Sequence, residues 1–591
     1  MSATITYVTF KPTARKVVNK IKQLREKVSF TLSLGLFFSF LFLTFSSINW
    51  RVDPHHDGYI FFPAYIGTFG KLPPQVDTAY GIAQPLIESH FMRIFGTSLL
   101  TYRSIAAILI SASGILLFMI LATRISRSNS VLMSCLWLAA NPNWSGASKS
   151  IPNAIQVSWP NLWIQTLTLV CVYFVLKDRK LRYYEILLVL IISCSLPFFR
   201  IQGIIPGFIV ILFLFKLHIK PERIISSLFV IFLNVLFWIS LIEMNGGVRL
   251  YLSNILTEPI AKMEKYTQKS IVIDWIVGVG NYFMVVGLGL LVLYYIFNFR
   301  FRKSYSFTRY IILFFMLISA SNFIRKPELW ISVFTNHITT LLLDSTILIA
   351  VMYLVKFCFE YKVEQFKKAK NYFPNLFTAI LALSNLIFIY PLPDLGHRWW
   401  SSAFCIVFLI FCIESEQEEG TSFRKVIISP LLTVLTILTL LISLFQGSEF
   451  LKIKTYKVQQ TEKYFLNGMR YPIDSQEAMI NLRKSVKLLE KIESKNIEIK
   501  FFCRDGLYYI RDKYKSDYYL KSLKFIDLKL FDNTLEGEYV SFFCNLGLEE
   551  LAGRSYSGKY EIGTDRVDTF IFHNMSEEQI QYLLADLKES P

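Results

Sequence analysis

The run "SFTLSLGLFFSFLFLTFSSIN", residues 29–49, decides the fold class of this chain. It contains no charged residue and is long enough to cross a bilayer, for which a helix needs about 20 residues. The basic stretch "KPTARKVVNKIKQLREK", residues 11–27, precedes it. Because the positive-inside rule keeps such a flank in the cytoplasm, the run delivers the residues after it to the outer face. A cleaved signal peptide is the alternative, but the run lacks a clear small-residue cleavage site and further apolar runs follow.

The composition also points to a membrane protein. Of the 591 residues 53% are hydrophobic and 16% aromatic, and the mean hydropathy is +0.42. These values lie outside the usual range for a soluble enzyme. The net charge of +18 would suit a nucleic-acid-binding protein, but Lys and Arg gather in short links between apolar runs, as the positive-inside rule predicts. We therefore expect a lipid bilayer as partner and no nucleic acid.

The apolar runs predict about thirteen spans. They begin near residues 29, 104, 130, 161, 183, 201, 223, 271, 309, 338, 375, 402 and 426. Alternating these spans across the bilayer places every basic link in the cytoplasm: "RISRS", "KDRKLR", "KLHIKPER", "RFRKSYSFTR", "KVEQFKKAK" and "FRK". An odd number of spans leaves the C-terminal tail outside.

The predicted organisation has three parts. Residues 1–28 form a basic cytoplasmic N-terminus, residues 29–446 a transmembrane domain whose first outer loop covers 50–103, and residues 447–591 an extracytoplasmic domain. In the tail, "IEIKFFC" and "YVSFFC" predict strands and "SQEAMINLRKSVKLLEKIES" a helix, which indicates a small α/β fold. If this tail lies outside the cytoplasm, Cys503 and Cys544 could form a disulfide.

The first outer loop is too polar to span the membrane. Its stretch "LIESHFMRIFG" has apolar residues at helical spacing and predicts an amphipathic helix lying on the membrane surface. We expect Glu88 and His90 on the solvated face of this helix.

Under this topology the unusual polar clusters fall on the outer side of the membrane. They are "DPHHDGY", "NPNWSGASKSIPNAIQVSWPN", "PFFRIQG", "SNFIRKPELWISVFTNH" and "PLPDLGHRWW". Five of the seven histidines, His55, His56, His90, His337 and His397, belong to outer segments. The distribution indicates one functional site at the outer interface.

The cluster "DPHHDGY", residues 53–59, places two carboxylates and two imidazoles within five positions. Asp53 or Asp57 could remove the proton of a hydroxyl acceptor as a general base. A second interpretation of the motif is a site for a divalent ion such as Mg or Mn at His55, His56 and Asp57. Adjacent histidines make poor joint ligands, however, unless the loop bends. A third is structural, since Asp-Pro and Gly favour a turn and the acids can cap a helix.

Cations in the other outer clusters could hold the phosphate of a lipid-linked donor. Arg200, Lys326 and Arg398 are the candidates. Arg200 could instead be an arginine that extends its head to the interface, and Asp394, His397 and Arg398 could be a local ion pair in a loop. Aromatic residues that could stack on sugar faces are Tyr59, Tyr80, Trp399 and Trp400, although interfacial aromatics are also the ordinary membrane belt.

These features resemble the GT-C superfamily of membrane glycosyltransferases, in the bacterial branch related to protein mannosyltransferases and the lipid A aminoarabinose transferase. The motif "DPHHDG...PA...G", Asp53 to Gly70, and "DTAYG", Asp77 to Gly81, resemble the start of such proteins. Shorter similar patterns follow: "PNA" at Pro152 to Ala154, "RIQG" at Arg200 to Gly203 and "PLPDLGHRWW" at Pro391 to Trp400. The first 200 residues carry the resemblance best.

The resemblance implies a polytopic α-helical membrane protein with a GT-C-like fold, outer-face surface helices and the small C-terminal domain. It also implies inverting transfer of a sugar from a polyprenyl-phosphate donor to a lipid, glycan or protein acceptor, outside a bacterial inner (plasma) membrane. Asp53 or Asp57 would then be catalytic. The expected substrate-binding residues are His55, His56, Asp77, Tyr80, Arg200, Asp394, His397 and Arg398.

A transporter or flippase of lipid-linked glycans is the alternative function. Such a protein should place polar residues at mid-membrane and show repeated halves. The sequence shows neither feature.

Overall fold

The computed structural model describes residues 12–50, 54–70, 81–141, 157–177, 179–245, 247–249, 251–252, 255, 346–347, 350–351, 372–389, 395–415, 458–460, 470–472, 476–502, 538–543, 559–562 and 568–585. The helices of the first part are α1 (Pro12–Ser46), α2 (Pro54–Gly67), α3 (Ala83–Phe95), α4 (Leu99–Leu121), α5 (Arg127–Ala139), α6 (Pro160–Val175), α7 (Tyr183–Ser195), α8 (Ile204–Leu217) and α9 (Ile224–Met244). Two further long helices are α15 (Tyr372–Asn385) and α16 (Leu395–Ser415). Short 3₁₀ turns are η2 (Leu196–Phe198), η3 (Ile201–Gly203), η4 (Pro221–Arg223) and η6 (Leu386–Ile389).

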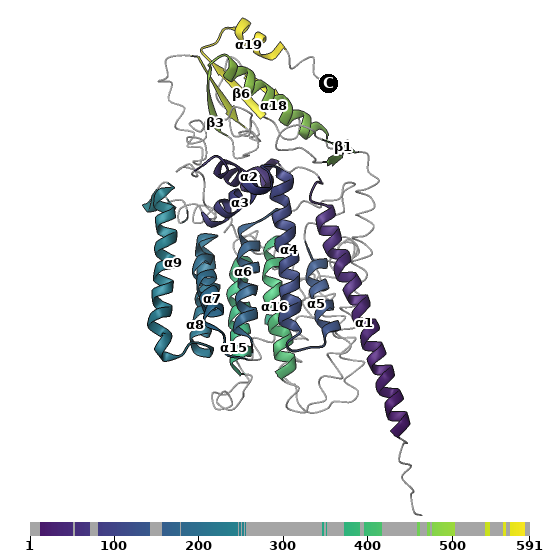
Figure 1. Ribbon diagram of the computed structural model, residues 1–591. Coiled ribbons are helices and arrows are strands. Elements are labelled where there is room, and N and C mark those ends of the chain that lie inside the picture. The colour runs from purple at the N-terminus through teal and green to yellow at the C-terminus, as the bar shows by residue number, and fades with distance from the viewer. Residues whose placement is uncertain are drawn as a thin grey trace, which may run out of the picture.

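The long helices form a bundle with two distinct ends (Figure 1). Helices α2 and α3 lie across one end, which we call the α3 end. Hydrogen bonds fix the direction of the chain through the bundle: Trp163, near the start of α6, bonds to α3, whereas Lys180 after α6 bonds to the end of α8. Helices α6, α7, α8 and α9 therefore alternate in direction between the α3 end and the opposite, basic end.

Local signals explain where several helices begin. The side chain of Ser98 accepts a hydrogen bond from the backbone N–H of Thr101 and caps α4, and Ser126 caps α5 in the same way through Asn129. Pro160 occupies the first turn of α6, where its missing N–H costs no hydrogen bond.

Most of the predicted span starts that fall on described residues coincide with helices. Those near 104, 130, 161, 183, 201, 223, 375 and 402 lie close to the starts of helices α4 to α9, α15 and α16. The starts near 271, 309, 338 and 426 lie outside the described residues. In the described part, Leu99–Leu121 and Pro221–Met244 are helices long and apolar enough to span a bilayer, and Phe30–Ser46, Pro160–Val175, Tyr183–Phe198, Ile201–Leu217 and Phe373–Phe388 are shorter apolar helices. The count of thirteen stays a prediction.

The first helix begins earlier than predicted. Helix α1 starts at Pro12, so the basic stretch and the apolar run form one helix of 35 residues. The reason is that Lys, Arg, Gln and Glu are good helix formers and no glycine or proline separates the stretch from the run.

Helix α9 presents a largely exposed apolar surface. Ile225 is 82% exposed, and Phe229 and Phe232 are each 58% exposed. The buried residues of this helix are Ser227, Trp238 and Ile242. Since soluble proteins rarely expose continuous apolar faces of this kind, α9 fits the edge of a bundle that contacts lipid.

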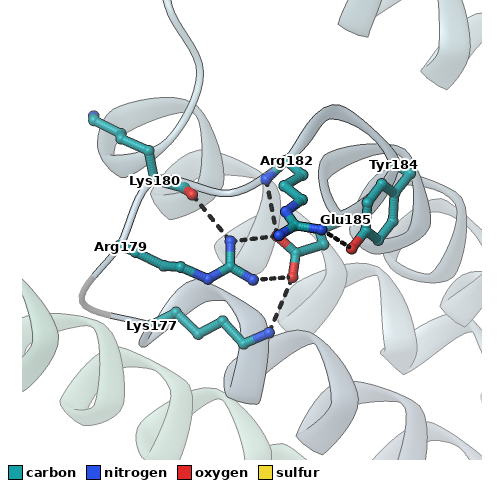
Figure 2. Close-up of polar contacts among 6 residues, drawn as sticks. All are labelled: Lys177, Arg179, Lys180, Arg182, Tyr184 and Glu185. Carbon is teal, nitrogen blue, oxygen red and sulfur yellow. Dashed lines mark hydrogen bonds and ion pairs between the residues drawn. The ribbon is translucent and has the colours of Figure 1, made fainter.

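The basic end of the bundle is organised around Glu185, in the first turn of α7 (Figure 2). Its carboxylate receives Lys177 Nζ at 3.0 Å and the Arg179 guanidinium at 2.6 and 2.8 Å. It also accepts a hydrogen bond from the backbone N–H of Arg182 at 2.8 Å, which caps the start of α7. One nearly buried acid therefore ties the link between α6 and α7, and Lys180 joins this link to α8 through the carbonyl of Leu217 at 2.8 Å.

The C-terminal part is an α/β unit beyond α2 and α3 (Figure 1). Its elements are β1 (Val458–Gln460), β2 (Arg470–Pro472), α18 (Gln476–Ser494), β3 (Glu498–Phe502), β4 (Tyr539–Phe543), β5 (Lys559–Ile562), β6 (Asp568–His573) and α19 (Glu577–Leu584). The larger sheet has the order β3-β4-β6-β5, with β3 and β4 parallel and the other pairs antiparallel. Buried side chains of α2, α18 and this sheet belong to one apolar cluster, so the unit packs on the α3 end. Cys503 and Cys544 lie outside the described residues.

Candidate functional site

Part of the predicted site lies beyond what the structure describes. Asp53, Asp77, Tyr80 and Asp394 are outside the described residues. The backbones of His55, His56 and Asp57 form the first turns of α2, whose first residue is Pro54, but their side chains are not described. The segment that follows Asp53 is thus helical rather than a turn, and the choice between Asp53 and Asp57 as base stays open.

Arg103 fixes the chain that leads into this segment. Its side chain is fully buried in α4, and its Nη1 donates to the carbonyl of Trp50 at 2.8 Å and to that of Ile48 at 3.3 Å. These carbonyls belong to the residues just after the end of α1 at Ser46. Arg103 therefore anchors the backbone three positions before Asp53.

Arg200 is one of the two predicted phosphate ligands that the structure describes, and Arg398 is the other. Arg200 is half-buried, and its Nη1 donates to Asn161 Oδ1 at 2.9 Å. Asn161 lies in the first turn of α6, and Trp163 in the same turn stacks on Phe199, with ring centroids 5.5 Å apart and an interplanar angle of 27°. The start of α6, at the α3 end of the bundle, therefore contacts both Phe199 and Arg200.

A glycine permits close packing beneath Arg200. Gly81 has φ +97°, and a Cβ added there would lie 2.3 Å from the carbonyl oxygen of Phe198. Gly81 closes the motif "DTAYG" and leads into α3, so the start of α3 rests directly on the backbone before Arg200.

The prediction for Glu88 is wrong, because its side chain is buried rather than solvated. It has no exposed surface, whereas His90 on the same helix is exposed, as predicted. Glu88 Oε1 accepts hydrogen bonds from Ser158 Oγ at 2.6 Å and Trp163 Nε1 at 2.8 Å, and Gln84 Nε2 lies 3.2 and 3.3 Å from its two oxygens. Burial raises the pKa of Glu88 to about 8, although these three hydrogen bonds lower it.

The reason for this error is the direction in which α3 faces. Ile87 and Ile94, seven residues apart on one face of α3, are 39% and 76% exposed, while Gln84, Glu88 and Ser89 are buried. A helix at a membrane surface turns its apolar face to lipid, so its polar stripe is free to pack against the protein.

The start of α16 supplies two further predicted residues. His397 and Arg398 are half-buried, and the His397 ring meets the edge of Trp400 at 5.1 Å between centroids. Trp399 stacks on Trp137 of α5 at 4.6 Å, and each indole N–H donates to the backbone carbonyl of the other residue, at 2.8 and 3.2 Å.

Residues at the start of α6 contact both Arg200 and the start of α16. Trp159, just before α6, lies 6.4 Å from Trp400 between ring centroids, and Asn161 two residues later holds Arg200. Helix α2, which carries Asp57, packs against α3, where Arg93 donates to the carbonyl of Thr68 at 3.0 Å. The described candidates therefore gather at the α3 end around the start of α6.

Sequence reasoning missed Arg103 and the buried role of Glu88. The signal for Arg103 was present: it is a lone arginine at the outer end of a predicted span, where the positive-inside rule does not require a cation. For Glu88 the signal was the i, i+4 spacing from Gln84, which places the two polar side chains next to each other on the helix.

The predicted metal site involves side chains outside the described part of the chain. Among the described side chains no group of three His, Cys, Asp or Glu residues could hold a metal ion. The side chains of His55, His56 and Asp57 are not among them, so a divalent ion at these residues stays a prediction.

Comparisons with known proteins give one similarity. No family model matches the sequence, and no curated protein matches it. Among solved structures, the crystal structure of ArnT from Cupriavidus metallidurans bound to undecaprenyl phosphate is similar, with a TM-score of 0.44 and 9% sequence identity over 91% of this chain and 97% of that chain.

Proposed function

We propose that this chain is a membrane-embedded glycosyltransferase that moves a sugar from a polyprenyl-phosphate donor to a lipid, glycan or protein acceptor on the extracytoplasmic side. The observation that carries the proposal is the placement of Arg200, a cation held by Asn161 at the end of an apolar bundle. Because Asn161 lies in the first turn of α6, Arg200 is at the α3 end, opposite the basic links, where the positive-inside rule does not account for a cation. An anionic headgroup at the membrane surface would explain it.

In the proposed reaction the acceptor hydroxyl attacks the anomeric carbon of the donor sugar. The bond between that carbon and the phosphate oxygen breaks, and the lipid phosphate leaves with the bonding electrons. Arg200 stabilises the negative charge of this leaving group through its planar guanidinium. Asp53 or Asp57 takes the proton of the hydroxyl as the attack proceeds. Attack from the face opposite the phosphate inverts the anomeric configuration.

The remaining predicted residues have binding roles in this proposal. His397 and Arg398 lie in the first turn of α16 and contact the donor in this proposal. In the sequence, Asp77 and Tyr80 precede α3 and Asp394 precedes α16. We assign these residues, with His55 and His56, to substrate contact. Their individual roles are tested by substitution in the transfer assay.

The test uses purified protein and a panel of radiolabelled polyprenyl-phosphate sugars, with release of lipid phosphate and transfer of label as readouts. We expect turnover with at least one donor. Arg200→Ala should weaken donor binding, and Arg200→Lys should restore only part of it, because lysine lacks the bidentate fork. Arg223→Ala, which removes an arginine from the basic end, is the matched control and should leave donor binding intact. Donor binding that is unchanged in Arg200→Ala would remove Arg200 from the site.

One observation favours the alternative of a transporter or flippase. The side-chain amide of Gln165 and the hydroxyl of Thr168 are buried in the middle of α6 without a hydrogen-bond partner among the described residues. Polar groups at mid-membrane are typical of transport pathways. Proteoliposomes separate the two functions: movement of a lipid-linked glycan between leaflets without loss of its sugar would favour transport, and cleavage of the sugar–phosphate bond favours transfer.

A further inference from the structure

A fully buried carboxyl group sits where α3 meets the start of α6. We call Gln84, Glu88, Ser158 and Trp163 the Glu88 cluster. Three donors converge on Glu88: the Ser158 hydroxyl, the Trp163 indole and the Gln84 amide. The same Gln84 amide also donates to the backbone carbonyl of Ser158. In the described part of the chain, no Lys, Arg or His forms an ion pair with Glu88.

Simple packing does not account for an acid in this position. A leucine or methionine would fill a similar space on α3 without the cost of removing a carboxyl group from water. The cluster joins three separate segments, namely α3, the residues before α6 and α6 itself, through polar contacts that each require a particular geometry. An apolar contact would allow α3 to slide against α6, whereas these hydrogen bonds fix its position.

The cluster leads directly to Arg200. The indole that donates to Glu88 belongs to Trp163, and the ring of Trp163 stacks on Phe199. Asn161, two residues before Trp163, holds the guanidinium of Arg200. The orientation of this helix turn therefore determines both the backbone before Arg200 and the position of its side-chain partner.

We propose that Glu88 is a positioning residue for Arg200: it fixes the first turn of α6 through Trp163 and Ser158, and thereby holds the guanidinium in the direction of the donor phosphate. This inference rests on the proposed function in so far as Arg200 binds that phosphate. Glu88 touches neither donor nor acceptor in this account.

Two variants test the inference in complementary ways. Glu88→Ala removes the acceptor of the Ser158 hydroxyl and the Trp163 indole, while the Gln84 amide keeps its bond to the Ser158 carbonyl. Trp163→Phe keeps an aromatic ring against Phe199 and removes only the N–H that donates to Glu88, so it stays informative if Glu88→Ala does not fold. Glu88→Gln keeps one acceptor oxygen, so its exchange rates and its affinity for polyprenyl phosphate should be closer to those of the wild type. His90→Ala, an exposed position on the same helix, is the matched control.

The first readout is amide hydrogen exchange by mass spectrometry, which needs no donor. Glu88→Ala and Trp163→Phe should speed exchange about 2- to 10-fold in peptides covering 158–163 and 196–203, the size expected for the loss of a hydrogen bond. Peptides covering 216–223 at the basic end and all peptides of His90→Ala should match the wild type. Unchanged exchange in 196–203, or an equal rise across the whole chain, overturns the inference.

The second readout is the affinity for a polyprenyl phosphate, measured for each variant with Arg200 present and with Arg200→Ala. Glu88→Ala should weaken binding when Arg200 is present and have no further effect when Arg200 is absent, because it acts through that residue. Equal loss in both backgrounds would overturn the positioning role. If the wild type binds no polyprenyl phosphate, the proposed function fails, and the exchange result still decides whether Glu88 orders the segment around Arg200.

Discussion

Gly81→Ala is the sharpest test of how α3 is seated beneath Arg200. Alanine at this position meets two obstacles. The backbone φ of +97° is one that residues with a Cβ rarely adopt, and the new Cβ would lie 2.3 Å from the Phe198 carbonyl oxygen and 2.9 Å from the Phe199 carbonyl carbon. The second obstacle comes from backbone atoms, so no side chain can rotate away to relieve it. The start of α3 and the backbone before Arg200 must move apart.

The chain offers a matched control for the first obstacle. Gly96 has φ +107°, but its nearest neighbour to an added Cβ is Thr101 Oγ1 at 3.9 Å. Gly96→Ala thus introduces backbone strain alone, worth about 1–3 kcal/mol. Gly81→Ala adds a steric clash of about 1–3 kcal/mol to the same strain, since forcing atoms into a packed site costs an amount of this order. We expect the free energy of unfolding to fall further in Gly81→Ala by that second amount.

Denaturant titration of the detergent-solubilised protein, followed by tryptophan fluorescence, measures the difference. Donor affinity is measured on the same samples. Gly81→Ala should also weaken donor binding, because Phe198 and Phe199 immediately precede Arg200, whereas Gly96→Ala should not. Equal unfolding free energies for the two variants would refute the close approach of the α3 start to the backbone before Arg200.

Three further predictions concern the rest of the site. Arg103→Met should lower the free energy of unfolding by about 1–3 kcal/mol in the same titration, because it leaves buried carbonyls without a donor; an unchanged value would remove Arg103 as the anchor of the first outer segment. A membrane-impermeant thiol reagent should label Phe69→Cys but not Lys180→Cys in intact cells, and labelling of Lys180→Cys alone would invert the topology. If a divalent ion is bound, chelation should lower transfer, added metal should restore it, and His55→Ala or His56→Ala should mimic chelation; full activity in the chelator would exclude the metal.

The sequence predicted the bundle well where an apolar run has clear ends. The run that became α4 is preceded by Ser98, a good cap, and its helix begins at Leu99, close to the predicted start near 104. The start of α1 was misplaced because hydropathy detects the membrane-spanning part of a helix and not the polar turns that continue it. Hydropathy also does not show which face of a surface helix meets lipid, and for this reason Glu88 was placed in solvent.

The candidate site could be predicted only as a set of residues at one end of the bundle. Arg200 could be predicted as a site residue because the positive-inside rule does not call for a cation at that end of the bundle. Its partner Asn161 could not be predicted, because it lies 39 positions earlier in the sequence and meets Arg200 only when α6 and η3 pack together. The same holds for Trp137 and Trp399, whose mutual hydrogen bonds join segments 262 positions apart.

The most direct test of the account compares Asp53→Asn with Asp57→Asn in one transfer assay, with folding and donor affinity checked for both. A general base contributes about 10²- to 10⁴-fold in rate, so removing it should lower turnover by that order while donor affinity stays near the wild-type value. We expect this loss in Asp53→Asn, because in the sequence Asp53 is closer than Asp57 to the end of α1 at Ser46. Wild-type turnover in both variants would show that this segment does not supply the base, and would contradict the glycosyltransferase proposal.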